Sequence, residues 1–249
     1  LKSSMEAKDG ELPIFVINAF TSRPFGGNPA AICLPGHQEL NSSTYQNLAA
    51  QMNISETAFI TKKSQSQDYK TGDCFNLRWF SPTVEVPLCG HATLASAAVL
   101  YYVVGNQNEC LTFDTQSGPL RVKKDGNYLC LDMPINKPNI LEEDVVEKLH
   151  ALIEATIGDL LVDCVYYSAN TRKLLVRLMD STSRSKFEEF HPDFHSMLSS
   201  APPHETIDVR GVIVTVKGSE EYCNEQGVQF DFVSRYFAPW VGINEDPVT

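Results

Sequence analysis

The sequence lacks charge over one long stretch, since residues 86–108 contain no Asp, Glu, Lys or Arg. Within it, residues 91–103 predict a helix that is apolar or small on every face. A helix that is hydrophobic all round is buried. The run is shorter than the roughly 20 apolar residues of a membrane span, and it is rich in Ala, Ser and Thr. We therefore expect a central helix over 91–103, wrapped by the rest of its domain.

Basic residues are also scarce, because 20 Lys and Arg stand against 31 Asp and Glu, for a formal net charge of -11. No cluster of Lys or Arg stands out. This balance argues against a nucleic-acid partner and against an anionic-membrane surface. The length of 249 residues suits one large domain or two modest ones.

The seven cysteines lack the spacings that mark disulfide or metal chemistry. Their number is odd and they form no CxxC pair, which favours reduced thiols in a cytoplasmic protein. His and Cys do not pair at the usual spacing of zinc ligands. His191 and His195 stand at i and i+4, but no third ligand is apparent. The sequence therefore predicts no metal site.

The pattern of apolar residues predicts a chain rich in strands. Expected strands cover 12–20, 30–34, 54–61, 75–80, 110–114, 119–123, 128–133, 162–167, 174–179, 209–216 and 228–237. Expected helices, besides the central one, cover 41–52, 141–157, 181–190 and 192–199, the first capped by Ser42, Ser43 or Thr44. Segment 134–138, with a proline at each end, predicts the connection between domains 12–133 and 139–249. The glycines of GGNP at 26–29 lack the spacing of a phosphate-binding loop and predict a turn geometry.

Glu56 is the most informative carboxylate of the sequence. Strand alternation places it on one face with Ile54, Ala58 and Ile60. An arbitrary glutamate at a strand end usually reaches solvent. A carboxyl that instead lies in a partly apolar pocket can take up and return a proton.

The start of the central helix is a second candidate site. Its free backbone N–H groups and the positive end of its dipole are buried with it, so they favour an anionic partner such as a carboxylate. Cys89, Gly90 and His91 lie at this point. Gly90 allows a ligand to approach the backbone closely, and a thiol there is acidified.

A short internal echo suggests a duplicated fold. The segment RWFSP at 78–82 is repeated as RYFAP at 235–239. Counting eleven residues on from Arg78 reaches Cys89, and the same count from Arg235 reaches Asp246. Two such copies suggest one site built from both halves of the chain.

These segments together resemble the PhzF family of phenazine biosynthesis-like proteins. The matching stretches are AFTSRPFGGNPAAICL (19–34), MNISETAFI (52–60), LRWFSPTVEVPLCGHATLASAAVL (77–100) and SRYFAPWVGINEDPVT (234–249). The resemblance implies an α+β, diaminopimelate-epimerase-like fold. Two related domains would each wrap a mostly antiparallel sheet around a central helix, with the active site in the cleft between them.

The resemblance also implies a function and a set of site residues. The family's acid/base glutamate matches Glu56, its Gly-His matches Gly90 and His91, and its Asp-Pro-x-Thr aspartate matches Asp246. We expect an isomerase that moves a proton on a small carboxylate-bearing metabolite, needs no cofactor and forms a homodimer. Glu56 would carry the proton, while His91 and Asp246 would hold the polar groups of the substrate.

Two further positions complete the expected site. Ser55 matches a substrate-lining position of the family. Cys89 stands where epimerase relatives carry one catalytic thiol, but Asp246 replaces the second thiol. This exchange favours an isomerase with one carboxylate base over a racemase with two thiols.

In the family, the Asp-Pro-x-Thr motif leads into a second central helix. Thr249 ends the sequence given, so we expect that helix beyond it, and no activity from a chain that truly ends there. A cavity in place of the helix would be too costly to keep.

Two other functions remain open. A relative that has lost catalysis would serve as a binding or scaffold protein, although Glu56, His91 and Asp246 are all retained. A cysteine-nucleophile enzyme would use Cys89 and His91. Against it, residues two apart at a helix start are not expected to face each other, and no third orienting group is evident.

Overall fold

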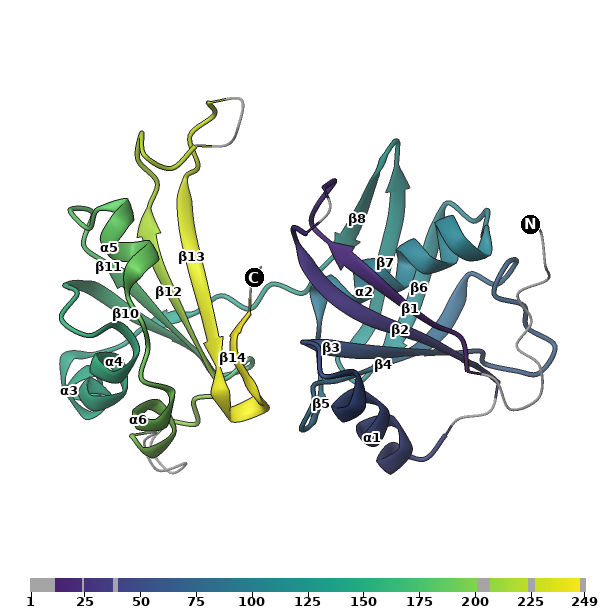
Figure 1. The fold of residues 1–249 in the computed structure, drawn as a ribbon, viewed down its shortest axis with the longest axis horizontal. Coiled ribbons are helices and arrows are strands. Elements are labelled where there is room, and N and C mark those ends of the chain that lie inside the picture. Colours follow the sequence, from purple (N-terminus) through teal and green to yellow (C-terminus); the bar gives the residue numbers. More distant parts are fainter. Residues whose placement is uncertain (1–11, 24, 38–39, 201–206, 224–226, 247–249) are drawn as a thin grey trace. The chain divides into compact units, whose positions relative to one another are not determined.

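The computed structural model describes residues 12–23, 25–37, 40–200, 207–223 and 227–246, and the chain divides into two compact units (Figure 1). The first unit is Leu1–Pro134 and the second is Ile135–Thr249. The boundary therefore lies at the first proline of segment 134–138. Among the described residues, no helix has the length and hydropathy that crossing a membrane requires.

The first unit is built on one eight-stranded sheet. Its strands are β1 (Ile14–Ala19), β2 (Asn28–Gly36), β3 (Glu56–Thr61), β4 (Cys74–Phe80), β5 (Glu85–Val86), β6 (Cys110–Thr115), β7 (Gly118–Asp125) and β8 (Tyr128–Asp132). They lie in the order β1-β2-β3-β4-β6-β7-β8, and β5 pairs with β4. The pairs β2–β3 and β4–β6 are parallel, while the others are antiparallel.

Helix α2 (Gly90–Ala98) is enclosed by this sheet, and it continues as a π-helical turn, Val99–Val104. It contacts β1 and β8, the two edges of the sheet, as well as β2 and β3 (Figure 1). The strands therefore curl around it, as its uncharged sequence predicts. The prediction of burial on every face is wrong at the carboxyl end, where Tyr102 is 58% and Val103 38% exposed. The π-helical turn there directs these two side chains to solvent and Tyr101 to the core.

Helix α1 (Ser42–Met52) covers the other face of the sheet next to β3. Its Tyr45 ring packs on Phe59 with centroids 4.1 Å apart. The predicted cap is wrong by one residue, because Asn41 caps this helix, its side-chain oxygen accepting from the Thr44 N–H at 2.8 Å. With α1 on one face and α2 on the other, all six residues of β3 are buried.

The second unit is a six-stranded sheet with helices packed against one face. In chain order it contains β9 (Asn139–Ile140), α3 (Glu143–Lys148), α4 (His150–Ile157), β10 (Val162–Ser168), β11 (Lys173–Leu178), α5 (Arg184–Glu189), α6 (Phe194–Ser199), β12 (Gly211–Lys217), β13 (Phe232–Ala238), a 3-10 turn (Pro239–Val241) and β14 (Ile243–Asp246). The strand order is β14-β13-β12-β11-β10-β9, and only β11–β12 is parallel.

The core of the second unit lies between this sheet and helices α4, α5 and α6 (Figure 1). Val176 and Val214 are fully buried there. The alternate residues belong to the opposite face. Tyr166, Leu175, Ile213 and Tyr236 are paired in one row across four strands, and all are only partly buried.

The structure corrects the boundaries of several predicted elements in this unit. The helix expected over 141–157 is two helices, α3 and α4. They are separated at Leu149, whose N–H bonds to the Val146 carbonyl in a tighter turn. Leu149 is 1% exposed, so the break turns its side chain into the core. Strands β9 and β14 are short edge strands that the apolar pattern did not predict.

The internal echo is a structural repeat. Arg78 on β4 makes two hydrogen bonds to Glu85 on β5, and Arg235 on β13 makes two to Glu245 on β14. The guanidinium groups also lie 5.2 Å and 5.1 Å from the ring centroids of Phe80 and Phe237. Each unit therefore contains a strand whose arginine binds a glutamate on the short strand that follows it.

The repeat corrects the equivalence obtained by counting residues. Trp79 pairs with Val86, and its counterpart Tyr236 pairs with Asp246. Asp246 is therefore the counterpart of Val86 and not of Cys89. The count fails because the 3-10 turn Pro239–Val241 lengthens the second connection.

Candidate active site

Glu56 begins strand β3, on the face that meets helix α2. Ala58 and Ile60, two and four residues further on, belong to the core cluster around α2. Phe59 points the other way, toward α1. Glu56 is 6% exposed. Its side chain therefore lies on the apolar face of the strand, as strand alternation predicts.

His91 is the second residue of helix α2, and its ring lies beside the Glu56 carboxyl. The His91 Nε2 atom is 3.3 Å from Glu56 Oε2 and 3.2 Å from Ser55 Oγ. Burial lowers the pKa of His91 to about 4, partly offset by a hydrogen bond to the Pro29 carbonyl. The imidazole is therefore neutral at pH 7, and it can act as a hydrogen-bond donor and acceptor without bringing a positive charge to the site.

The hydrogen bonds of Ser55 fix which nitrogen of His91 carries the proton. Ser55 Oγ lies 2.9 Å from the Pro29 carbonyl oxygen and 3.1 Å from Asn28 Oδ1, and both of these atoms accept. The single hydroxyl proton is directed to them, so the serine oxygen presents a lone pair to His91 Nε2. Nε2 is then the protonated nitrogen, and Nδ1 keeps its lone pair.

The free Nδ1 atom of His91 faces Cys89, whose Sγ lies 3.4 Å away. The expectation that these two side chains would not face each other is wrong. Cys89 precedes the helix with extended backbone angles, φ -146° and ψ 115°, so helical spacing does not apply to it. The orienting group that sequence reasoning did not find is present too, since Ser55 Oγ lies 3.2 Å from Nε2 on the other side of the ring.

Glu56, Cys89 and His91 converge on one small volume. One ligand atom from each of the three lies within 4.8 Å of the other two, and all three residues are buried. Cys89 and His91 are therefore neighbours in space, although their spacing in the sequence is not one that zinc ligands commonly use. The cluster brings a carboxyl, a thiol and an imidazole together at the start of a buried helix.

Two residues of this region were missed as site residues by sequence reasoning. Asn28 is fully buried and lies against Ser55, and Pro29 supplies the carbonyl that both Ser55 and His91 use. The sequence GGNP predicts a turn, and Gly27 does adopt a φ of 74°, where a Cβ atom would clash with the Ala19 carbonyl oxygen. One sequence signal could have identified Asn28. A polar amide side chain stands at the start of an apolar segment that has the composition of a buried strand.

Gly90 lies between Cys89 and His91 at the first position of α2. A Cβ atom added there would meet Met133 Cε at 3.7 Å and Leu131 Cδ2 at 3.9 Å, which are ordinary contacts. The fold itself therefore leaves room for a side chain at this position.

The remaining predicted site residue, Asp246, belongs to the second unit. It is the last residue of β14, where it pairs with Tyr236 of β13. The structure thus brings Ser55, Glu56, Cys89 and His91 together within the first unit, with Gly90 between the last two.

The other histidines of the sequence do not build a second site among the described residues. His191 and His195 are exposed, and no third metal-ligating side chain of the described chain joins them. His150 on α4 is exposed and lies 3.8 Å from Glu154. His204 lies outside the described residues.

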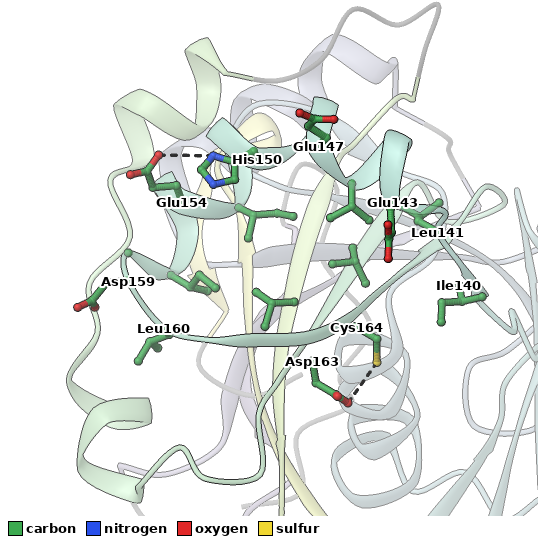
Figure 2. Close-up of a pocket in the computed structure, with 16 residues that line it drawn as sticks. Ile140, Leu141, Glu143, Glu147, His150, Glu154, Asp159, Leu160, Asp163 and Cys164 are labelled. Atoms are coloured by element: carbon green, nitrogen blue, oxygen red, sulfur yellow. Dashed lines mark hydrogen bonds and ion pairs between the residues drawn. The ribbon is translucent and has the colours of Figure 1, made fainter.

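A hollow of about 820 Å³ lies in the second unit, between α3, α4 and β10 (Figure 2). Its floor is apolar, and exposed acidic side chains such as Glu143 and Glu147 stand at its rim. Figure 2 shows the His150–Glu154 ion pair at one end and Asp163 beside Cys164 at the other, well separated. Because no titratable groups converge there, we place the candidate site at the buried cluster of the first unit.

The architecture is a diaminopimelate-epimerase-like α+β fold. A predicted epimerase from Pseudomonas aeruginosa shares the fold alone, with a TM-score of 0.57 at 18% identity over 81% of this chain and 68% of that one. A PhzF-family crystal structure from Enterococcus faecalis is nearer, with a TM-score of 0.72 at 35% identity. The match covers 95% of this chain and 77% of the Enterococcus faecalis chain.

The chain belongs to the PhzF family. Residues 17–249 match the model of the phenazine biosynthesis-like proteins. A human phenazine biosynthesis-like domain-containing protein is 47% identical over 96% of this chain and 80% of its own length. An uncharacterized isomerase of Halalkalibacterium halodurans is 40% identical over 95% of this chain and 77% of its own length.

Proposed function

We propose that the protein is a cofactor-independent isomerase that moves a proton on a small carboxylate-bearing metabolite, with Glu56 as the acid and base. The observation that carries the proposal is the Glu56 carboxyl, 6% exposed on the α2 face of β3, with His91 Nε2 at 3.3 Å. Two bacterial relatives are named isomerases, which supports the same reaction class.

The chemistry follows from the groups present. A C–H bond next to a carboxylate or imine is weakly acidic, so breaking it needs a positioned base and stabilisation of the developing anion. Glu56 would take this proton and return it to another carbon. The electron pair of the broken C–H bond would form a new double bond at the carbon that loses the proton. The pair of the old double bond would take up the proton at its far carbon, so atoms and electrons balance without a redox partner.

The helix start supports the assignment of the substrate class. The first N–H groups of α2 favour an anion, and no side chain caps this end. Gly90 would let a substrate carboxylate approach the backbone, since the fold leaves that space open. The neutral His91 side chain would hold a further polar group of the substrate.

The test is incorporation of deuterium from solvent into candidate substrates. Small carboxylates with acidic C–H bonds, including a dihydroanthranilate, are incubated in D₂O and read by mass spectrometry. We expect label with the wild-type protein and a loss of at least about 100-fold in rate with Glu56→Gln. Glu85→Gln, on strand β5 of the same sheet, is the matched control and should keep the activity.

The absence of label in every compound, from folded full-length protein, would contradict the proposal and favour a binding relative without catalysis. Equal labelling by Glu56→Gln would also contradict it, because the proton would then travel through another group.

A cysteine-nucleophile enzyme is the second candidate, favoured by the 3.4 Å approach of Cys89 Sγ to a histidine held on its far side. Cys89→Ser separates the two functions. A nucleophile mechanism predicts a loss of several orders of magnitude and a trapped covalent adduct in the wild type. The proton-transfer mechanism predicts that Cys89→Ser keeps most of the activity that Glu56→Gln loses.

A further inference from the structure

The hollow between α3, α4 and β10 is an elongated groove, and Figure 2 shows Asp159 near one end of it and Ile140 near the other. One wall is a stripe of residues three or four positions apart, which is the spacing of a single helix face. It comprises Glu143, Val146, His150, Ile153 and Ile157. At 1.5 Å per helical residue, this stripe extends over roughly 20 Å. The opposite wall is β10 together with the turn that precedes it.

The floor of this groove is apolar and open to solvent. None of the six residues of α3 is buried, although Val146 on this helix is apolar and lines the groove. Ile140, on the short edge strand β9, is 61% exposed. Ile153 and Val165 lie deeper and belong to the core of the second unit. Such a continuous apolar floor, rimmed by polar residues, is typical of a surface that binds a partner.

The rim of the groove carries charge of one sign. Carboxylates stand along it at Glu143, Glu147, Glu154, Asp159 and Asp163, and no Lys or Arg of the described chain lines it. Within the described chain, only Glu154 and Asp163 of this set form an ion pair, with His150 and Arg177. The rim therefore offers negative charge along the whole length of an apolar floor.

We propose that this groove binds a basic amphipathic helix of a protein partner. Such a helix has an apolar stripe along one face, which matches the floor, and Lys or Arg beside the stripe, which matches the acidic rim. The formal net charge of -11 on the chain attracts a basic partner from a distance as well. Neither the floor nor the rim belongs to the proposed catalytic cluster, which lies in the first unit.

Other occupants match the groove less well. An added strand needs a regular sheet edge, but the register of β10 shifts between Val162 and Cys164, and such a bulge protects an edge from pairing. Nucleic acids and anionic lipids are repelled by the rim carboxylates. A small metabolite spans only part of a groove of this length. The helix is the occupant that meets both the length and the charge.

Binding is tested with a designed peptide and the full chain. The probe is a fluorescein-labelled peptide of Leu and Lys, with Leu at i, i+3, i+4 and i+7 over about four helical turns. One control peptide has the same composition with Leu spread around the helix, and a second has Glu in place of Lys. Fluorescence anisotropy measures the affinities. We expect the probe to bind at least about 10-fold more tightly than either control, with an affinity that falls as salt is added.

Variants locate the bound peptide. Glu143→Gln combined with Glu147→Gln removes two rim charges and should weaken binding about 10-fold. Glu142→Gln combined with Asp144→Asn is the matched control and should bind as the wild type does. It removes the same charge from the start of the same helix, at exposed positions that do not line the groove. Val146→Lys places a cation on the apolar floor and should weaken binding more than the rim variant does. Circular dichroism checks that each variant is folded.

Two results would overturn the proposal. One is wild-type protein that shows no preference for the probe over the two control peptides, a result that does not depend on any variant. The other is equal affinity for the probe in the folded rim variant and its matched control. Because no substrate enters these measurements, the groove and the isomerase function are tested separately.

Discussion

The two units carry the same short motif in different surroundings. In the first unit, the sheet curls around α2, and Trp79 of the motif is 1% exposed. In the second, the described helices cover one face of the sheet, and the counterpart Tyr236 is only partly buried, with the Lys173 ammonium 4.3 Å from its ring centroid. The arginine–glutamate pair is alike in both. The motif therefore forms the same pair of antiparallel strands in both units. The burial of the surrounding residues differs, and burial is what shifts the pKa of a polar group.

The contrast extends to the histidines. His91 in the first unit is 6% exposed, whereas His150, His191 and His195 in the second are exposed. Among the described histidines, only His91 on the enclosed helix lies buried beside a carboxyl. Burial within the curled sheet is therefore what distinguishes His91 from the exposed histidines of the second unit. Three predictions test this difference between the units.

The largest difference should appear between Trp79→Ala and Tyr236→Ala. Removing the fully buried indole leaves a cavity and should cost about 3–5 kcal/mol of the free energy of unfolding. Removing the partly exposed phenol should cost roughly 1 kcal/mol, since it loses mainly a surface cation–π contact. Urea unfolding followed by circular dichroism measures both.

Phe80→Ala and Phe237→Ala are the matched controls, because both rings are buried, at 2% and 0% exposed. They should be destabilised alike. A Tyr236→Ala variant as unstable as Trp79→Ala would show that the two units enclose the motif equally.

The next difference is in pH dependence. His91 has a pKa of about 4 in the folded protein against 6.5 unfolded. Between these values the unfolded chain binds a proton that the folded chain does not, so stability falls as the pH is lowered from 6.5 to 4. The first unit should lose on the order of 3 kcal/mol of its free energy of unfolding. The second unit has no buried histidine among its described residues, so it should lack this loss.

The two tryptophans of the chain make the measurement possible, since Trp79 reports on the first unit and Trp240 on the second. His91→Asn should remove the pH dependence below 6.5, and His150→Asn should leave it unchanged. An NMR titration that gives His91 an ordinary pKa would contradict the prediction.

The smallest difference is between the two ion pairs of the motif. Glu85→Gln should cost about 1–2 kcal/mol, because Arg78 and Glu85 are each 23% exposed and share two charged hydrogen bonds. Glu245→Gln should cost roughly 0.5–1 kcal/mol. Glu245 is 37% exposed, and Arg235 keeps its bonds to the Phe187 and Phe190 carbonyls. Thermal unfolding at low and high salt measures the destabilisation caused by each substitution. Equal destabilisation would show that solvent screens the two ion pairs equally.

Much of the first unit could be predicted from its sequence. A helix that is apolar or small on every face is buried, and strand alternation alone places Glu56 on the face of Ala58 and Ile60. Both follow from periodicity, which is a local property of the chain. The family resemblance then supplied the fold class.

What could not be predicted depends on departures from that periodicity. Cys89 faces His91 because its backbone is extended, and no residue pattern marks where helical angles begin to within one position. Asp246 was matched to Cys89 by counting, and a single 3-10 turn shifted the match. The roles of Asn28 and the Pro29 carbonyl needed the fold, since they act through contacts between distant strands and a helix.

Strand β3 is covered on both faces, and this has a consequence for the dynamics of the site. Segments with this degree of burial open only when the whole domain unfolds, while surface loops open far more often. The Glu56 backbone therefore does not take part in local opening. In the proposed isomerase, a substrate would meet a carboxyl whose conformational entropy was already lost when the chain folded, so little ordering would remain to be done in the encounter.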